Sequence, residues 1–188
     1  MENTLDNYQV DIINHYEKAF HQNAKIYIWD KGPYERLPND FRILEFPPTE
    51  AKNMWTYATC CMSQPEDTMR VELHLFSSKK DESIIELLTA LAFYHRVTNK
   101  IGLNHTVFLG RPWQNGSKCD YGFVSLPYID GPTLEDFNTT NGLIKFYWLL
   151  PVTENEVNYK KKFGVEALES KFDDPAFNYI DPNRSSVV

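Results

Sequence analysis

The amino-acid sequence predicts an α+β fold, in which helices pack on a mixed, largely antiparallel sheet. The expected strands follow one another in runs and do not alternate strictly with helices, an order that favours this class. Residues 69–76 alternate apolar and polar side chains, as a strand does when one face is buried and the other is at least partly exposed to solvent. Residues 143–150 are apolar at nearly every position, which predicts a central strand covered on both faces.

Three helices are expected along the chain. Residues 4–21 place apolar side chains at helical spacing, and residues 81–98 do so more clearly, with Asp81 or Ser78 able to cap the helix. Thr153 and Glu156 have the spacing of a capping box, in which each side chain bonds the other residue's backbone N–H. This pair predicts a C-terminal helix over about residues 154–172.

Short runs of β-branched and aromatic residues predict the strands. The expected strands are residues 25–29, 42–46, 54–62, 69–76, 106–109, 121–126 and 143–150. Pro151 is expected to end the last of them, because proline has no N–H to donate to a neighbouring strand. The connections at 30–42, 110–120 and 127–142 are longer than usual, so we expect them to carry function, and we expect the last of them to be irregular.

The length of 188 residues, with 42% apolar and 14% aromatic side chains, is enough for a substantial core. We expect residues 1–188 to form a single domain. The three cysteines, Cys60, Cys61 and Cys119, are odd in number and two are adjacent, which suits a reducing cytoplasm. The acidic N-terminus lacks the apolar region of a signal peptide, and no apolar run is long enough to span a membrane.

The net charge is −7, and residues 119–188 hold 11 acidic and 6 basic side chains. An acidic surface repels phosphate groups, so binding to nucleic acid or to an anionic membrane is disfavoured. A basic protein partner would suit this charge. Solubility alone accounts for the charge better than a basic partner does, so the charge by itself does not identify a partner.

A search for catalytic motifs finds little support for an enzyme. The sequence has no GxGxxG, GxxxxGK[ST], GxSxG, HExxH or CxxC motif, so it predicts no cofactor, metal site or catalytic residue. Cys60 or Cys61 beside His74 is the one arrangement that could activate a nucleophile. Two packed, inert thiols and a strand histidine explain these residues better.

The long loops supply candidate contacts for a protein partner. Trp113 and Tyr128 are the candidate aromatic anchors, because aromatic side chains bury a large area and keep a polar end. Asp130, Glu135 and Asp136 are the candidate contacts to a basic partner. The alternative is that the aromatic side chains hold these loops to the core, and the two interpretations are equally supported.

Several segments resemble the suppressor-of-fused family in its short bacterial form. Tyr57–Ser63 followed by Arg70–Leu73 is similar to the family's strand pair, although Cys61 stands where the family pattern has glycine. Phe146–Thr153 and the helix after it resemble the family's long strand and capped helix, and Asp181–Val188 resembles its C-terminal signature. The similarity covers most of the chain from residue 40 onward.

This resemblance implies a suppressor-of-fused-like α/β sandwich with no known catalytic site. The animal member sequesters transcription factors by protein contacts, and short bacterial relatives look like immunity proteins encoded beside polymorphic toxins. We therefore expect a cytoplasmic immunity protein, or antitoxin, that neutralises a basic toxin domain encoded nearby. The resemblance points to an LXG-type toxin with a nuclease C-terminal domain.

Two other functions stay open at this point. The chain could be a non-catalytic adaptor that takes an extended peptide of a regulatory protein onto a sheet edge, and an unfolded partner would mark that case. It could also be a small cysteine-dependent enzyme. Replacing Cys60 and Cys61 by serine would abolish the activity of such an enzyme and leave an immunity protein's binding intact.

Overall fold

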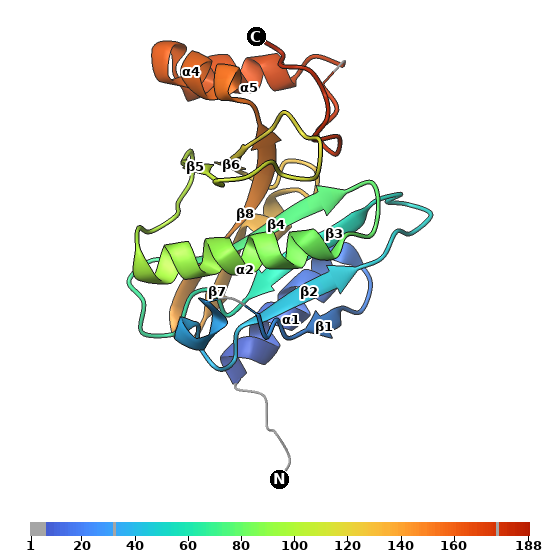
Figure 1. Cartoon of the computed structure of the whole chain (residues 1–188). Coiled ribbons are helices and arrows are strands. Elements are labelled where there is room, and N and C mark those ends of the chain that lie inside the picture. The colour runs from blue at the N-terminus through green and yellow to red at the C-terminus, as the bar shows by residue number, and fades with distance from the viewer. Residues whose placement is uncertain (1–6, 32, 176) are drawn as a thin grey trace.

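The computed structural model describes residues 7–31, 33–175 and 177–188. Within these residues the strands form one eight-stranded sheet in the order β1-β2-β3-β4-β8-β6-β5, with β7 also paired to β8 (Figure 1). The strands are β1 (Lys25–Tyr27), β2 (Arg42–Phe46), β3 (Trp55–Cys60), β4 (Arg70–Ser77), β5 (Thr106–Phe108), β6 (Tyr121–Ser125), β7 (Asp136–Thr139) and β8 (Gly142–Val152). The helices are α1 (Asn7–Phe20), the 3-10 turn η1 (Pro33–Arg36), α2 (Glu82–Val97), α3 (Pro132–Glu135), α4 (Glu154–Phe163) and α5 (Val165–Phe172).

The long strand β8 is the axis of the sheet. It runs parallel to β4 along one edge, and β7 and β6 pair antiparallel with successive parts of its other edge. All the other pairings are antiparallel. The sheet is therefore mixed and largely antiparallel with helices packed on it, which confirms the predicted fold class.

Helices α1 and α2 lie on opposite faces of the sheet (Figure 1). The α2 side buries Val71, Leu73 and Leu75 of β4. The prediction that the other face of β4 is partly wet is wrong, because Glu72 and His74 on that face are fully buried. Helix α1 covers this face, and its placement depends on packing that the local alternation of β4 does not encode.

The helix starts follow the capping chemistry of the sequence. The Asp81 side chain accepts from Ser83 N, and Thr153 and Glu156 form the complete capping box that opens α4. The predicted helix over 154–172 is in fact two helices, since Gly164 at φ 94° separates α4 from α5. Glycine reaches this backbone region without steric cost, so the chain turns there. Residues 4–6 of the predicted first helix lie outside the described residues.

Two predictions about the second half of the chain are also wrong. Residues 127–142 are not wholly irregular, because they contain α3 and β7. Pro151 does not end β8, which continues to Val152. Strand β4 pairs with β8 only as far as Trp148, and a strand that is open on one edge tolerates a proline there.

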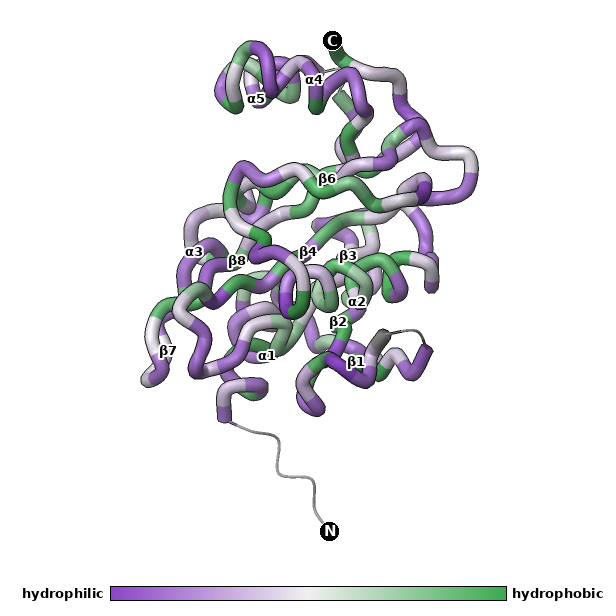
Figure 2. Tube along the Cα trace, turned by 60° about the vertical axis from the view of Figure 1, so that its left-hand side comes forward, coloured by the Kyte–Doolittle hydropathy of each residue, from purple (hydrophilic) through white to green (hydrophobic). Residues whose placement is uncertain are grey.

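Figure 2 shows that hydrophobic segments concentrate along the strands of the sheet, while hydrophilic ones lie mainly in the outer loops and helix faces. The buried side chains form three clusters, one under α2, one under α1 and one beneath α4 and the C-terminal segment. None of the described helices is both long enough and apolar enough to cross a bilayer.

The described residues of the segment after α5 form no helix or strand, as predicted, yet the segment is firmly attached. Arg184 is 8% exposed, and its guanidinium donates to both carboxylate oxygens of Glu156, at 2.6 and 3.0 Å, and to Pro151 O at 2.9 Å. Glu156 is itself fully buried and also accepts from Val187 N. A bidentate pair of this kind fixes geometry strongly, so the C-terminal segment is tied to the end of β8 and the start of α4.

A second buried carboxylate lies between α1 and the sheet. Glu72 accepts hydrogen bonds from the Thr59 hydroxyl at 2.6 Å and from the backbone and hydroxyl of Ser63 at 3.2 and 3.1 Å. Burial raises the pKa of Glu72 to about 7, against the opposing effect of these hydrogen bonds. The carboxyl therefore has a pKa well above its value of 4.5 in water.

We expect the contribution of Glu72 to stability to fall as the pH rises. Because its folded-state pKa lies above the unfolded value, the contribution is fully present below a pH of about 4.5 and is lost as the pH passes about 7. Denaturant unfolding of the parent and of Glu72→Gln across this pH range checks the effect. The parent's advantage in free energy of unfolding should shrink with rising pH, and a constant difference would contradict it.

Candidate functional site

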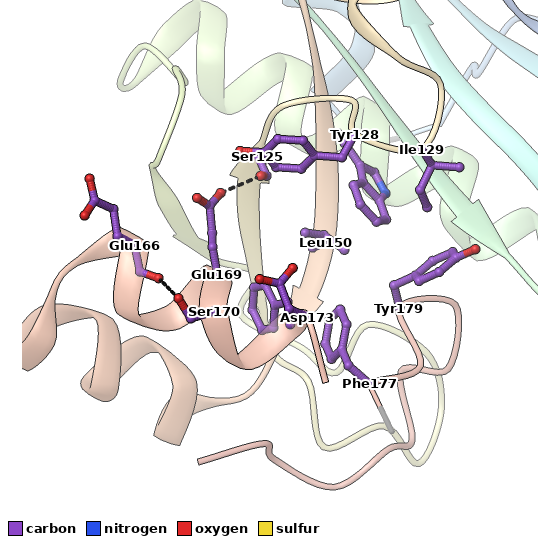
Figure 3. Close-up of a pocket in the computed structure, with 12 residues that line it drawn as sticks. Ser125, Tyr128, Ile129, Leu150, Glu166, Glu169, Ser170, Asp173, Phe177 and Tyr179 are labelled. Atoms are coloured by element: carbon purple, nitrogen blue, oxygen red, sulfur yellow. Dashed lines mark hydrogen bonds between the residues drawn. The ribbon is translucent and has the colours of Figure 1, made fainter. Parts of the chain in front are cut away.

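The candidate site is a groove between the loop after β6, the end of β8, helix α5 and the C-terminal segment (Figure 3). It encloses about 490 Å³. We call it the aromatic groove, and its lining residues are Ser125, Tyr128, Ile129, Trp148, Leu150, Glu166, Glu169, Ser170, Phe172, Asp173, Phe177 and Tyr179. This volume is within the range that binding pockets commonly show.

The floor and one wall of the groove are rigidly supported. Trp148 and Leu150 come from β8 and are nearly fully buried, so they form the floor. The wall formed by Phe177 and Tyr179 belongs to the C-terminal segment that Arg184 attaches, and the Arg184 guanidinium lies 4.5 Å from the centre of the Phe177 ring. Tyr179 in turn packs edge-on against Trp148, with ring centroids 5.3 Å apart.

The charged side chains of the groove are all acidic. Glu166, Glu169 and Asp173 come from α5 and its C-terminal cap, and no described residue that lines the groove is basic. Glu169 accepts from the Ser125 hydroxyl at 2.9 Å, which links α5 to β6. In Figure 3 Glu169 and Asp173 point toward the hollow, while Glu166 lies at one end. The groove thus combines an apolar interior with negative charge.

The upper wall carries two exposed apolar side chains. Tyr128 is 62% exposed and Ile129 is 41% exposed, although both are large. Burial, followed by the nearby charges of Glu169, Glu135 and Asp173, raises the pKa of Tyr128. The predicted aromatic anchor Tyr128 therefore lies in the groove and faces solvent.

Asp130 has a different environment from the one its candidate role requires. Its side chain is 6% exposed and bonds Lys52 Nζ at 2.5 Å, while its other oxygen lies 3.3 Å from His74 Nε2. Burial is the largest single influence on the pKa of Asp130 and raises it. The combined effect of His74 and Lys52 is greater and opposite, so the pKa is lowered. The basic partner of Asp130 is thus Lys52 of the same chain, and this pair ties the loop that carries Tyr128 to the connection between β2 and β3.

The other three candidate contacts are dispersed. Trp113 is 1% exposed and belongs to the core under α2. Its position fits the alternative interpretation, in which the aromatic side chain holds its loop to the core and does not contact a partner. Glu135 is half-buried and lies beside a small hollow under Tyr128. Asp136 is exposed and pairs with Lys145 Nζ at 2.6 Å. The structure therefore does not bring the five predicted residues together in one site.

The cysteine and histidine of the enzyme hypothesis are not brought together in a catalytic geometry. Cys60 and Cys61 are fully buried, with their sulfur atoms 3.8 Å apart, and His74 faces Asp130 instead. Burial raises the pKa of Cys60, and contact with Cys60 together with burial raises that of Cys61. Thiols of this kind are poor nucleophiles. Cys61 has φ 64°, the conformation that the glycine of the family pattern would favour.

A larger hollow of about 630 Å³ lies beside α1. It is lined by Asn14, His15, Lys18, Ala19, His21, Asp130, Thr133 and Phe137, so it mixes both signs of charge. His15 is already engaged with Leu134 O at 3.0 Å and stacks on Phe137. Among the described residues no group of three or more His, Cys, Asp or Glu side chains could hold a metal ion.

Sequence reasoning missed most of the aromatic groove. Its members come from residues 125–129, 148–150 and 166–179, which meet only in the folded chain. One available signal was the density of aromatic and acidic side chains after α5, where Phe172, Asp173, Phe177 and Tyr179 follow in close succession. Aromatic side chains on irregular chain need a packing surface, and here they pack on the end of β8 and on α5.

Comparison with known proteins identifies relatives of this chain. The profile of the suppressor of fused protein family matches residues 38–185. An uncharacterized protein of Ureaplasma parvum serovar 3 is 31% identical over 81 residues, a match that covers 43% of this chain and 40% of that protein. The chain thus spans less than half of this curated relative.

Solved structures show the same fold over nearly the whole chain. A suppressor of fused homologue from Neisseria gonorrhoeae is 30% identical, with a TM-score of 0.83 and coverage of 97% of both chains. A chain in the Sufu–Fu complex is 15% identical with a TM-score of 0.66, covering 96% of this chain and 92% of that one. Drosophila Suppressor of Fused is 14% identical with a TM-score of 0.72, and 51% of it is covered by 96% of this chain. The chain belongs to the suppressor of fused family.

Proposed function

We propose that this chain is a cytoplasmic immunity protein, or antitoxin, that neutralises a cognate polymorphic toxin by binding it through the aromatic groove. The observation that carries the proposal is the groove itself, with solvent-exposed apolar side chains and only acidic charges. Exposed aromatic side chains around a hollow mark protein interaction sites. A structural relative in the Sufu–Fu complex is itself seen with a protein partner.

The charge of the groove favours a basic partner. Nuclease domains carry basic clefts because they bind phosphate groups, and an acidic surface speeds encounter with such a cleft and blocks it. An LXG-type toxin with a nuclease C-terminal domain, encoded next to this chain, fits this chemistry. The proposed action is binding by the domain of residues 1–188, with no cofactor and no bond made or broken.

A calorimetric titration against the C-terminal domain of the large protein encoded beside this chain tests the proposal. We expect nanomolar binding that weakens as salt is raised, because acidic and basic surfaces attract less when screened. The variant Tyr128→Ala should weaken binding, whereas Phe108→Ala, which removes an equally exposed aromatic side chain from β5, should leave it unchanged. Absence of binding at both salt concentrations would refute the proposal.

A second candidate is an adaptor that binds an extended peptide. Strands β1 and β5 end the sheet, and each pairs with a single neighbour. Such an edge can accept a further strand. A partner that is unfolded when free, and whose binding is insensitive to Tyr128→Ala, would favour this function over the immunity role.

A further inference from the structure

The aromatic groove presents the chemical groups that bind a planar cation. Aromatic side chains from three segments line the hollow, namely Tyr128, Trp148, Phe172, Phe177 and Tyr179. Two carboxylates, of Glu169 and Asp173, point toward it (Figure 3). Aromatic faces attract cations, and a carboxylate beside them supplies the matching charge. No described basic residue lines the groove, although the Arg184 guanidinium already lies 4.5 Å from the centre of the Phe177 ring, on the C-terminal wall.

The same fold already holds one cation in this manner, at a different place. The Lys52 ammonium lies 4.5 Å from the ring centre of Phe20 and 4.1 Å from that of Phe76, and it bonds Asp130 at 2.5 Å. Two aromatic rings and one carboxylate are enough to keep this lysine largely buried. The groove offers the same kinds of group, aromatic rings and carboxylates, at its surface.

We propose that the aromatic groove binds an arginine side chain of the partner, within a segment that carries apolar residues on each side of the arginine. This inference rests on the proposed function and specifies its partner. A planar guanidinium stacks face to face on an aromatic ring and binds a carboxylate through two parallel hydrogen bonds, whereas an ammonium is a compact point charge without this planar fork. The Glu156–Arg184 pair, between the first turn of α4 and the C-terminal segment, is a two-bond contact of this kind within the same chain.

Apolar flanking residues follow from the rim of the groove. Tyr128 and Ile129 expose much of their surface on one side, and Phe172, Phe177 and Tyr179 are half-buried on the other. The hollow of about 490 Å³ is larger than one side chain requires, so neighbouring residues of the bound segment contact these surfaces. Burial of their apolar area adds affinity that a free arginine lacks.

A pair of matched tripeptides tests the inference on the full chain. The first is acetyl-Leu-Arg-Phe-amide, and the second replaces arginine by citrulline, which has nearly the same shape and no charge. With isoleucine methyl groups labelled for NMR, the arginine peptide should shift the Ile129 signal and bind about tenfold more tightly than the citrulline peptide. Equal affinity, or the absence of saturable binding at millimolar concentration, overturns the inference.

Charge-removing variants locate the contact. Asp173→Asn changes an exposed side chain at the end of α5, and Glu169→Gln changes the second carboxylate. Each should weaken binding of the arginine peptide by about tenfold and leave the citrulline peptide unaffected. Glu50→Gln removes the same charge from an exposed loop away from the groove and should change neither affinity. A loss of affinity for both peptides in Asp173→Asn would mean that the variant acts on groove shape and would overturn the assignment.

These experiments separate this inference from the proposed function. If the neighbouring protein binds the parent tightly and binds Asp173→Asn equally well, the immunity function stands and arginine recognition fails. If the arginine peptide binds as expected and the neighbouring protein does not bind at all, the groove has its assigned specificity and the toxin is not its partner.

Discussion

Arg184→Ala should lower the free energy of unfolding by about 3 to 5 kcal/mol, because it leaves a buried carboxylate without its counter-charge. Glu156 is fully buried and receives two of its hydrogen bonds from Arg184. The substitution also removes the bond from Arg184 to Pro151 O and the contact with the Phe177 ring. Denaturant unfolding followed by circular dichroism measures the loss.

Two further variants separate charge from geometry at this position. Arg184→Lys keeps the positive charge but cannot form the bidentate hydrogen bonds to Glu156. The stability of this variant should therefore lie between that of the parent and that of Arg184→Ala. Lys161→Ala removes one positive charge from an exposed position of α4 and should change stability by less than about 0.5 kcal/mol. If Arg184→Ala behaved like Lys161→Ala, the pair would have no structural role.

Trp113→Ala should be about as damaging, at about 3 to 5 kcal/mol, because it opens a cavity in the core under α2. The side chain is 1% exposed, and its backbone N–H bonds Cys119 O at 2.7 Å. Thermal and denaturant unfolding give the size of the effect. Tyr128→Ala, which removes an aromatic side chain that is 62% exposed, should change stability by less than about 0.5 kcal/mol.

These two variants should have opposite effects on partner binding. At a temperature where Trp113→Ala is still folded, it should bind the partner as the parent does, because Trp113 is not at the surface of the groove. Tyr128→Ala should lose affinity while its stability is unchanged. A stable Trp113→Ala that no longer binds would restore Trp113 as a contact residue.

Sequence reasoning succeeded where the controlling interactions are local. The capping box of Thr153 and Glu156 and the cap at Asp81 each involve residues within three positions of one another, and each forms as predicted. The order of the strands along the chain gave the fold class for a similar reason. Strand β8, with apolar residues at nearly every position, is central as expected and is buried along most of its length.

Sequence reasoning failed where the burial of a residue depends on segments that are distant in the sequence. Glu72 and His74 are polar residues of an alternating strand, so exposure was the natural expectation, but α1 covers them from residues more than 50 positions earlier. The loop position of Asp130 predicts a surface charge, but the side chain pairs with Lys52, which lies 78 residues earlier in the chain. The groove combines three separate segments, and no local spacing relates them.

The attachment of the C-terminal segment also has a consequence for the order in which the site is completed during synthesis. The sheet, α2 and the loop that carries Tyr128 are all made before residues 177–184, which supply one wall of the groove and the arginine that fastens it. A nascent chain can therefore assemble most of its core while the groove still lacks a wall. Competence to bind a partner through the groove, as proposed, then arises only after residue 184 has been made and Arg184 has reached Glu156.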